Sequence, residues 1–298
     1  MRNQFKGSLC LLIATFIWGT TFIAQSVGMD YIGPFTFQAV RCALAVAGLL
    51  PVIFLFDKQS GKSFCQEWKD RLLWKAGIAC GIPLFLAGNL QQIGIIYTTA
   101  GKAAFLTAMY IVMVPVLGIF LKRKVSFMVP ISVAIAVVGL YLLSFANVSR
   151  INLGDIALLG SALLYAVQIL SADRFVADVD PLRLNCLQVG VCAVGSAIVT
   201  VFTETVVISD LLNCWFPLCY AGLLSMGMAH SMQIIGQKHV EPAAASLIMS
   251  MESVFAVLSG WLLLHEVLPF QEILGCILVF IAVILSQIPV ARKKKALN

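Results

Sequence analysis

Charged side chains are scarce in this chain. Only 11% of its 298 residues are Asp, Glu, Lys or Arg, and 60% are hydrophobic, whereas a soluble domain carries about 25% charged residues. Because this small number of charged residues cannot cover a water-soluble surface, we expect the chain to lie mostly in lipid. The net charge of +6 does not indicate nucleic-acid binding, because the basic residues form short clusters between apolar runs, as membrane flanks do.

Signatures of catalysis and of metal binding are also missing. The sequence contains no G-x-S-x-G, H-E-x-x-H, Walker or G-x-G-x-x-G motif. It has no C-x-x-C motif, and most of its nine cysteines lie within apolar runs. We expect these cysteines to be reduced thiols that pack as small apolar side chains. The sequence therefore predicts no catalytic residue, no metal site and no cofactor.

Long apolar runs dominate what is present. A helix that crosses the hydrocarbon needs about 20 apolar residues, and ten segments of the chain meet this requirement. The predicted spans are 7–28, 34–56, 74–96, 99–121, 125–144, 154–173, 182–203, 212–236, 242–264 and 267–290. The first is too long for the apolar part of a signal peptide. The predicted fold class is therefore all-α, a polytopic membrane protein with ten transmembrane helices.

The Lys and Arg residues indicate how these helices are oriented. With ten spans, 17 of the 20 Lys and Arg residues fall on one side of the membrane. Lys102 and Arg150 fall on the other side, and Arg41 lies within a span. The positive-inside rule then places both the N- and C-termini in the cytoplasm, and we expect the protein in the plasma membrane. Lys102, near the outer end of a span, is expected to reach the lipid headgroups.

The chain also resembles itself. The segment from Gly7 aligns with the segment from Gly154 at an offset of 147, and the segment from Ala100 aligns with that from Pro242 at an offset of 142. The halves 1–148 and 149–298 then hold five spans each. Because five is odd, the halves must enter the membrane in opposite senses. Such inverted five-helix repeats are typical of secondary transporters, whose substrate site lies near the membrane midplane.

Two charged residues lie within predicted spans. Glu252 is near the centre of the ninth span, where a charge facing lipid costs about 2.5–3.5 kcal/mol, so we expect it to face the interior. Arg41 lies in the second span. One interpretation makes Arg41 and Glu252 a pair that fixes helix packing. The other makes them binding groups, with Arg41 binding a carboxylate and Glu252 binding an amine or a proton.

Polar and aromatic side chains at mid-span positions complete a candidate cavity between the first, third, fourth, sixth, eighth and ninth spans. Each is interpreted either as a packing group or as a group that lines a substrate site. The candidate lining residues are Trp18, Asn89, Gln92, Tyr110, Tyr165, His230 and Glu252. Tyr110 is the repeat counterpart of Glu252. The candidates for proton coupling or an ion pair are Glu252, His230 and Arg41. His230 is included because imidazole titrates near neutral pH.

Three segments carry a family pattern. They are "ATFIWGTTFIA" in the first span, "AVRCALAVAGLLPV" in the second and "MESVFAVLSGWLLLHEVLPFQEILGCILVFIAVIL" near the end. Through them the chain resembles the EamA type of the drug/metabolite transporter (DMT) superfamily over nearly its whole length. Three positions depart from the pattern: Ser253 replaces the usual Pro, His265 replaces the Gly before Glu266, and Lys124 in "LKRKV" stands where an acidic residue is often found. The resemblance implies ten helices in two inverted repeats, alternating access, and small organic cargo, often amino acids, metabolites or drugs in efflux.

These features together predict a secondary active transporter of small organic solutes that works by alternating access around a midplane cavity. A membrane-embedded enzyme and a non-transporting receptor or scaffold on the same bundle are left as alternatives. A channel is disfavoured, since channels assemble pores from repeated subunits or from rings of identical groups. The expected partners are a small-molecule substrate and the lipid bilayer, with no nucleic acid, and a homodimer is left open.

Overall fold

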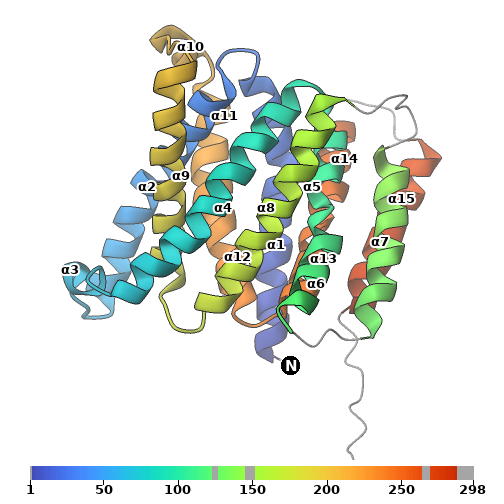
Figure 1. Cartoon of the computed structure of the whole chain (residues 1–298), viewed down its shortest axis with the longest axis horizontal. Coiled ribbons are helices and arrows are strands. Elements are labelled where there is room, and N and C mark those ends of the chain that lie inside the picture. Colours follow the sequence, from blue (N-terminus) through green and yellow to red (C-terminus); the bar gives the residue numbers. More distant parts are fainter. Residues whose placement is uncertain (1, 123–126, 145–151, 264–268, 287–298) are drawn as a thin grey trace, which may run out of the picture.

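The structure is built from helices. The computed structural model describes residues 2–122, 127–144, 152–263 and 269–286, and within these ranges it contains helices and no strand (Figure 1). The helices are α1 (Arg2–Gly28), α2 (Pro34–Gln59), α3 (Phe64–Glu67), α4 (Arg71–Ile96), α5 (Ala100–Ala108), α6 (Tyr110–Phe120), α7 (Met128–Ser144), α8 (Leu153–Phe175), α9 (Pro181–Thr203), α10 (Ile208–Asn213), α11 (Trp215–Cys219), the π-helical segment η1 (Tyr220–Ala229), α12 (His230–Gln237), α13 (Pro242–Met249), α14 (Met251–Leu263) and α15 (Phe270–Ser286).

The helices match the ten predicted spans. Eight helical segments are long and apolar enough to cross a bilayer, and the shorter apolar helices α7 and α15 occupy the two remaining predicted spans. Three spans are divided in the structure, into α5 with α6, into α11 with η1 and α12, and into α13 with α14. The prediction of a polytopic all-α membrane protein is confirmed.

The two halves of the chain run through the molecule in opposite directions. α1 begins at the lower end of Figure 1, where the N-terminus is marked, whereas α8 begins at the upper end. Helix contacts follow a matching pattern, because α1 packs against α12 and η1 while its counterpart α8 packs against α4. α2 packs against its own counterpart α9, and α7 packs against α15. This pattern supports the proposal of inverted repeats 1–148 and 149–298, whose junction lies outside the described residues.

Glycines allow close helix crossings at both ends of the bundle. A Cβ atom added at Gly7 of α1 would lie 2.9 Å from the carbonyl oxygen of Gly236 in α12. A Cβ atom added at Gly154 of α8 would lie 2.9 Å from the carbonyl oxygen of Gly94 in α4. The repeat alignment places Gly7 on Gly154 and Gly94 on Gly236, so one packing arrangement occurs twice. Small residues permit such close contacts in lipid, where apolar burial does not drive helices together.

A buried ion pair lies beside the crossing of α4 and α8 at Gly94 and Gly154. Lys102 Nζ in α5 lies 2.7 Å from Asp155 Oδ2 in α8, and neither side chain is more than 6% exposed. The prediction that Lys102 reaches the headgroups is therefore wrong, because a carboxylate from another helix holds its ammonium group inside the bundle. The repeat counterparts are Ala244 and Ser8, which carry no charge. The ion pair consequently occurs at one end of the bundle only.

The packed helices α2 and α9 are joined at both of their ends. At one end Asp57 of α2 forms a buried ion pair with Arg183 of α9. At the other end Glu204, the residue directly after α9, accepts hydrogen bonds from the backbone N–H groups of Phe35 (3.0 Å) and Thr36 (2.8 Å) in α2. A carboxylate stabilises a helix N-terminus through these free N–H groups and the helix dipole.

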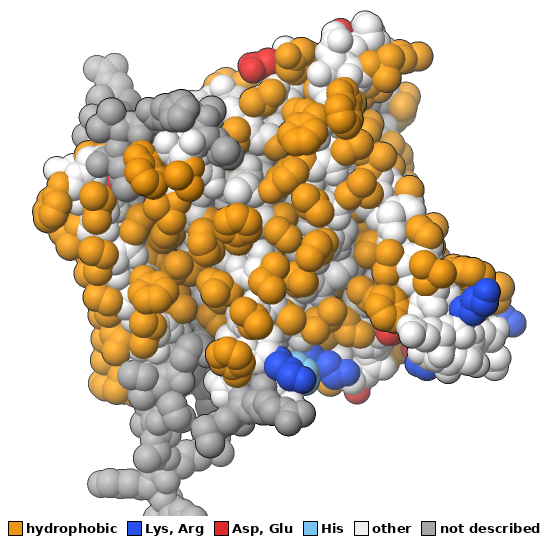
Figure 2. Space-filling model, turned by 180° about the vertical axis from the view of Figure 1, so that it is seen from behind, with side chains coloured by type: hydrophobic (Ala, Val, Ile, Leu, Met, Phe, Trp, Pro, Cys, Tyr) orange, Lys and Arg blue, Asp and Glu red, His pale blue; other side chains and the backbone are white. Residues whose placement is uncertain are grey.

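An apolar surface surrounds the bundle. Figure 2 shows hydrophobic side chains over most of one face, with the Lys and Arg side chains gathered toward the lower edge. This edge is the end at which α1 begins in Figure 1. Large side chains such as Phe54, Phe216 and Phe280 are more than half exposed, which suits contact with acyl chains. Arg150, which the sequence places on the opposite side, lies outside the described residues.

Candidate functional site

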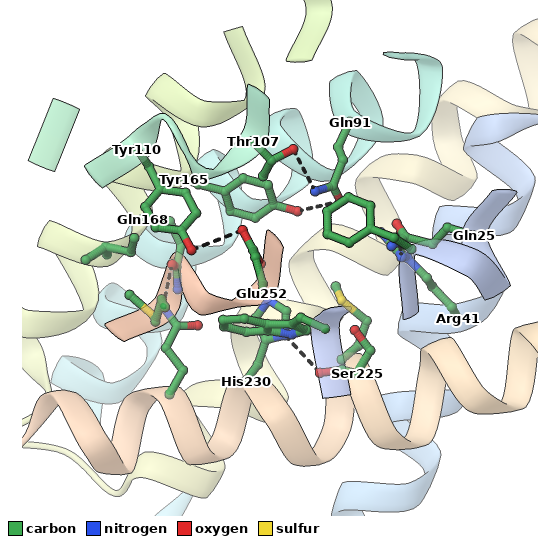
Figure 3. A pocket seen from close by; sticks show the side chains of 16 residues that line it. Gln25, Arg41, Gln91, Thr107, Tyr110, Tyr165, Gln168, Ser225, His230 and Glu252 are labelled. Atoms are coloured by element: carbon green, nitrogen blue, oxygen red, sulfur yellow. Dashed lines mark hydrogen bonds between the residues drawn. The ribbon is translucent and has the colours of Figure 1, made fainter. Parts of the chain in front are cut away.

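A cavity whose lining combines polar, charged and aromatic side chains lies inside the bundle (Figure 3). Its volume is about 40 Å³, which is room for about three water molecules. The lining residues are Trp18, Phe22, Gln25, Arg41, Gln91, Thr107, Tyr110, Tyr165, Gln168, Ile169, Ser225, Met226, His230, Gln233, Met249 and Glu252. They come from the six predicted spans and, in addition, from the second. A solute of ordinary size would require the lining to move apart.

Three spans depart from regular α-helix beside this cavity. α5 changes to α6 at Met109, and α13 changes to α14 at Ser250. The repeat alignment places these two breaks within one residue of each other. The last of these three is the eighth predicted span, which contains η1. The π-helical turns of η1 end immediately before His230. Interrupted helices at mid-membrane depth are a recurrent way of building binding sites in transporters.

Glu252 and Tyr110 meet across the cavity. The Tyr110 hydroxyl donates a hydrogen bond to Glu252 Oε1 at 3.1 Å, as Figure 3 shows. Both side chains are less than 5% exposed, so the expectation that Glu252 avoids lipid agrees with its position. Because the two residues are repeat counterparts, this bond joins equivalent points of the two halves.

Tyr165 belongs to a second chain of hydrogen bonds in the same cavity. Its hydroxyl donates to Gln91 Oε1 at 3.2 Å, and Gln91 Nε2 donates to Thr107 Oγ1 at 3.3 Å (Figure 3). These bonds join α8, α4 and α5. Amide and hydroxyl groups both donate and accept, so each can exchange a protein partner for a bound solute at low cost.

His230 is held by the π-helical segment. Its Nδ1 atom lies 3.0 Å from the Ser225 carbonyl oxygen, five residues earlier, which is the spacing of a π-helix. The carbonyl can only accept, so Nδ1 carries the proton and Nε2 is the remaining acceptor. The His230 and Trp18 rings pack edge to face with centroids 5.0 Å apart. No hydrogen bond joins His230 to Glu252 among the described residues, so a proton relay between them would need a bridging water or solute.

Arg41 does not pair with Glu252. Its Nε and Nη2 atoms donate to Gln38 Oε1, and its Nη1 atom donates to Gln25 Oε1 at 2.7 Å. Gln38 fits here because Gly88 leaves space, since a Cβ atom at Gly88 would lie 2.3 Å from Gln38 Nε2. The interpretation of Arg41 and Glu252 as a packing pair is thus wrong for this conformation, although both residues line the same cavity.

Asn89 and Gln92 lie outside the cavity lining. Asn89 Nδ2 donates to Ser196 Oγ of α9 at 2.8 Å, and Gln92 Nε2 donates to the Gln25 carbonyl oxygen of α1 at 3.4 Å. The α4 helix carries amides on several faces, and Gln91 is the one that reaches the cavity. Both predicted residues therefore take the alternative interpretation, interhelical hydrogen bonding.

Most of the lining obeys the repeat. Five pairs of counterparts line the cavity together, namely Trp18 with Tyr165, Phe22 with Ile169, Gln91 with Gln233, Thr107 with Met249 and Tyr110 with Glu252. The sequence analysis named four of these residues and missed the other six. Extending the two offsets from Trp18 and from Tyr110 along their helices, three to four residues at a time, would have found Phe22 and Thr107.

The fold and the cavity together define a multi-pass membrane protein that encloses polar and charged side chains away from lipid. Comparisons with known proteins supply the family. The EamA-like transporter family matches residues 5–145 and again residues 152–287, so the chain belongs to this family, as the motifs predicted. The protein is a membrane transporter of the DMT type.

Relatives and solved structures agree with this assignment. An uncharacterized transporter of Archaeoglobus fulgidus is 30% identical over 301 residues, which cover 97% of this chain and 88% of the relative. The uncharacterized transporter YoaV of Bacillus subtilis is 22% identical and is covered over 99% of its length. A crystal structure with 16% identity superposes with a TM-score of 0.76, covering 94% of this chain and 96% of that one, and shows the fold alone. The family and these names point to a transporter rather than an enzyme.

Proposed function

We propose that the protein is a secondary active transporter of small organic solutes that works by alternating access around the cavity. The observation that carries the proposal is the cavity lining itself. Arg41, Glu252 and a set of amides lie buried within lipid-crossing helices, where polar groups are costly and mark transport pathways. Metabolites, amino acids and drugs in efflux are the cargo that the family resemblance suggests.

The small size of the cavity supports the alternating-access part of this proposal. A volume of about 40 Å³ leaves little room for an amino acid or a larger metabolite, so we expect the spans to separate when one binds. The close crossings at Gly7–Gly236 and Gly94–Gly154 lie toward opposite ends of the bundle. Loosening one crossing while the other stays closed would open the cavity to one side at a time.

Proton coupling through Glu252 is the coupling mechanism we propose. Glu252 is the acidic residue of the cavity lining, and its partner there is the Tyr110 hydroxyl, which carries no charge. A carboxyl group at this depth can take up a proton on one side and release it on the other as the cavity changes its exposure. His230 is a second candidate carrier, because its Nε2 atom is left as an acceptor.

The orientation and the membrane are also proposals. We place the protein in the plasma membrane with both termini in the cytoplasm, because the Lys and Arg side chains gather at the end where α1 begins. Partners beyond the solute and the bilayer are not needed by this scheme. A homodimer is the one association left open.

The test is transport by the purified protein in liposomes, with a panel of radiolabelled amino acids, carboxylates, amines and sugars. Saturable flux that shows counterflow and depends on the imposed pH gradient is the expected result. Glu252→Gln should abolish the dependence on the pH gradient. Glu67→Gln, at a partly exposed glutamate on α3 whose only described ion pair is the 3.9 Å contact with Lys62, should leave it unchanged. The absence of saturable flux for the whole panel would favour a receptor or scaffold.

A further inference from the structure

Arg41 carries a buried charge with no carboxylate beside it. Its side chain is 2% exposed, and its hydrogen-bond acceptors are the neutral amides of Gln38 and Gln25. Among the described residues no carboxylate oxygen lies within 4.0 Å of the guanidinium group. A buried charge without an opposite partner is strongly unfavourable. The other buried cations, Lys102 and Arg183, each have such a partner.

The cavity also contains unused hydrogen-bond donors. A guanidinium group has five N–H donors, and the described bonds of Arg41 use three of them, one on Nε and one on each Nη atom. One N–H group therefore remains on each terminal nitrogen. The indole Nε1 atom of Trp18, which lines the same cavity, is buried and has no hydrogen-bond partner among the described residues.

Glu252 is not the missing carboxylate partner of Arg41. Its carboxylate lies in the same cavity, but its described bond is to Tyr110 and not to Arg41. Figure 3 shows Arg41 beside Gln25 at one side of the cavity and Glu252 beside Tyr110 toward the other. The repeat counterpart of Arg41 is Gln188, which bonds to Gln168 at 2.9 Å. The cationic end of the cavity is thus a feature of one repeat.

We infer that the transported solute carries a carboxylate, or an anionic group of similar geometry, which binds the Arg41 guanidinium and the Trp18 indole N–H. Two oxygens of one carboxylate match the two N–H groups on the terminal nitrogens of Arg41, and such paired bonds are strong in a water-poor site. The aromatic rings of Phe22 and Tyr165 form an apolar wall of the same cavity. This inference rests on the proposed transport function and specifies its substrate class.

The test measures binding to purified protein by the shift of its thermal unfolding midpoint in detergent. The probes are two matched sets of four compounds, each set sharing one carbon skeleton. One set is 3-phenylpropanoate, L-phenylalanine, L-phenylalaninamide and 3-phenylpropanamide, and the smaller set is propionate, L-alanine, L-alaninamide and propionamide. Within at least one set, the two carboxylates should raise the midpoint and the two amides should not. Equal shifts for acid and amide, or no shift in either set, would overturn the inference.

Variants of Arg41 assign the effect to its guanidinium group. Arg41→Gln should weaken carboxylate binding about 10- to 100-fold, the loss expected for hydrogen bonds to a charged group. Arg41→Lys should retain part of the affinity, because it keeps the charge but loses the paired geometry. Arg174→Gln, at an exposed arginine of α8, is the matched control and should bind as the unmodified protein does. Carboxylate affinity that is unchanged in Arg41→Gln refutes the assignment.

Trp18→Phe provides a second variant in case Arg41→Gln does not fold. It keeps an aromatic ring and removes only the unpartnered N–H group, so carboxylate affinity should fall about 3- to 10-fold, the effect of one hydrogen bond. Unchanged carboxylate affinity in this variant also counts against the inference. Liposome flux separates the two proposals. Transport of amines or sugars but not carboxylates would leave the transport function standing and reject the substrate class. Carboxylate binding without flux would leave the carboxylate site standing and reject the transport function.

Discussion

Removing the charge of Lys102 is expected to destabilise the protein strongly. Lys102→Met leaves the Asp155 carboxylate buried in the first turn of α8 without its ammonium partner at 2.7 Å. Breaking a buried ion pair from one side costs about 3–5 kcal/mol, because the remaining charge is uncompensated. Asp155 retains the backbone N–H of Asn152 at 3.0 Å as a hydrogen-bond donor. We therefore expect a loss near the lower limit, about 3 kcal/mol in the free energy of unfolding.

The assay is reversible unfolding in mixed detergent micelles, followed by circular dichroism, for a double-mutant cycle. The cycle comprises Lys102→Met, Asp155→Asn and the double variant. If the pair is buried, the double variant should be less destabilised than the sum of the single variants by more than about 1 kcal/mol. Lys62→Met breaks an exposed pair with Glu67 at 3.9 Å and should cost at most about 1 kcal/mol. Equal losses for Lys102→Met and Lys62→Met would refute the burial of the Lys102 pair.

Three further predictions concern the cavity and its helix contacts. Glu252→Gln should leave a solute able to exchange across the membrane but remove the stimulation of its flux by a pH gradient. Persistent stimulation in liposomes would exclude Glu252 as the proton carrier. Gly154→Ala places a Cβ atom 2.9 Å from a carbonyl oxygen and should cost about 1–3 kcal/mol, whereas Gly101→Ala, with no atom within 4 Å of the added Cβ, should be neutral in the same unfolding assay. Ser253→Ala removes the hydroxyl that donates to the Ala104 carbonyl oxygen at 3.0 Å and should lower stability by about 0.6 kcal/mol, the average for such bonds between membrane helices. A loss above about 2 kcal/mol would mean that Ser253 does more than this bond.

The spans and the fold class could be predicted because each depends on local composition. A run of about 20 apolar residues has few stable environments other than a membrane helix, and the ten runs reappear as helices. The breaks at Met109 and Ser250 were not predicted. Both interruptions lie within predicted membrane spans, where hydropathy carries no signal for a break in the helix.

The site was predicted in part. Glu252 and Tyr110 were found because a polar group at mid-span is expensive and because the repeat placed them at equivalent positions. Asn89 and Gln92 were chosen over Gln91 because one helix considered alone does not reveal which neighbour each face meets. The partner of Lys102 was missed for a related reason, since Asp155 comes from a different helix. His265 and Lys124, at positions where the family pattern is altered, lie outside the described residues.

The double attachment of α2 to α9 has a mechanical consequence. Asp57 with Arg183 at one end, and Glu204 with the start of α2 at the other, make the two helices resist both sliding and splaying. We expect α2 and α9 to move as one rigid unit through the transport cycle. The hinge motion then has to occur in the helices on either side of them. Arg41 lies in α2, so its guanidinium group would keep its place relative to α2 and α9 while the other helices that line the cavity move.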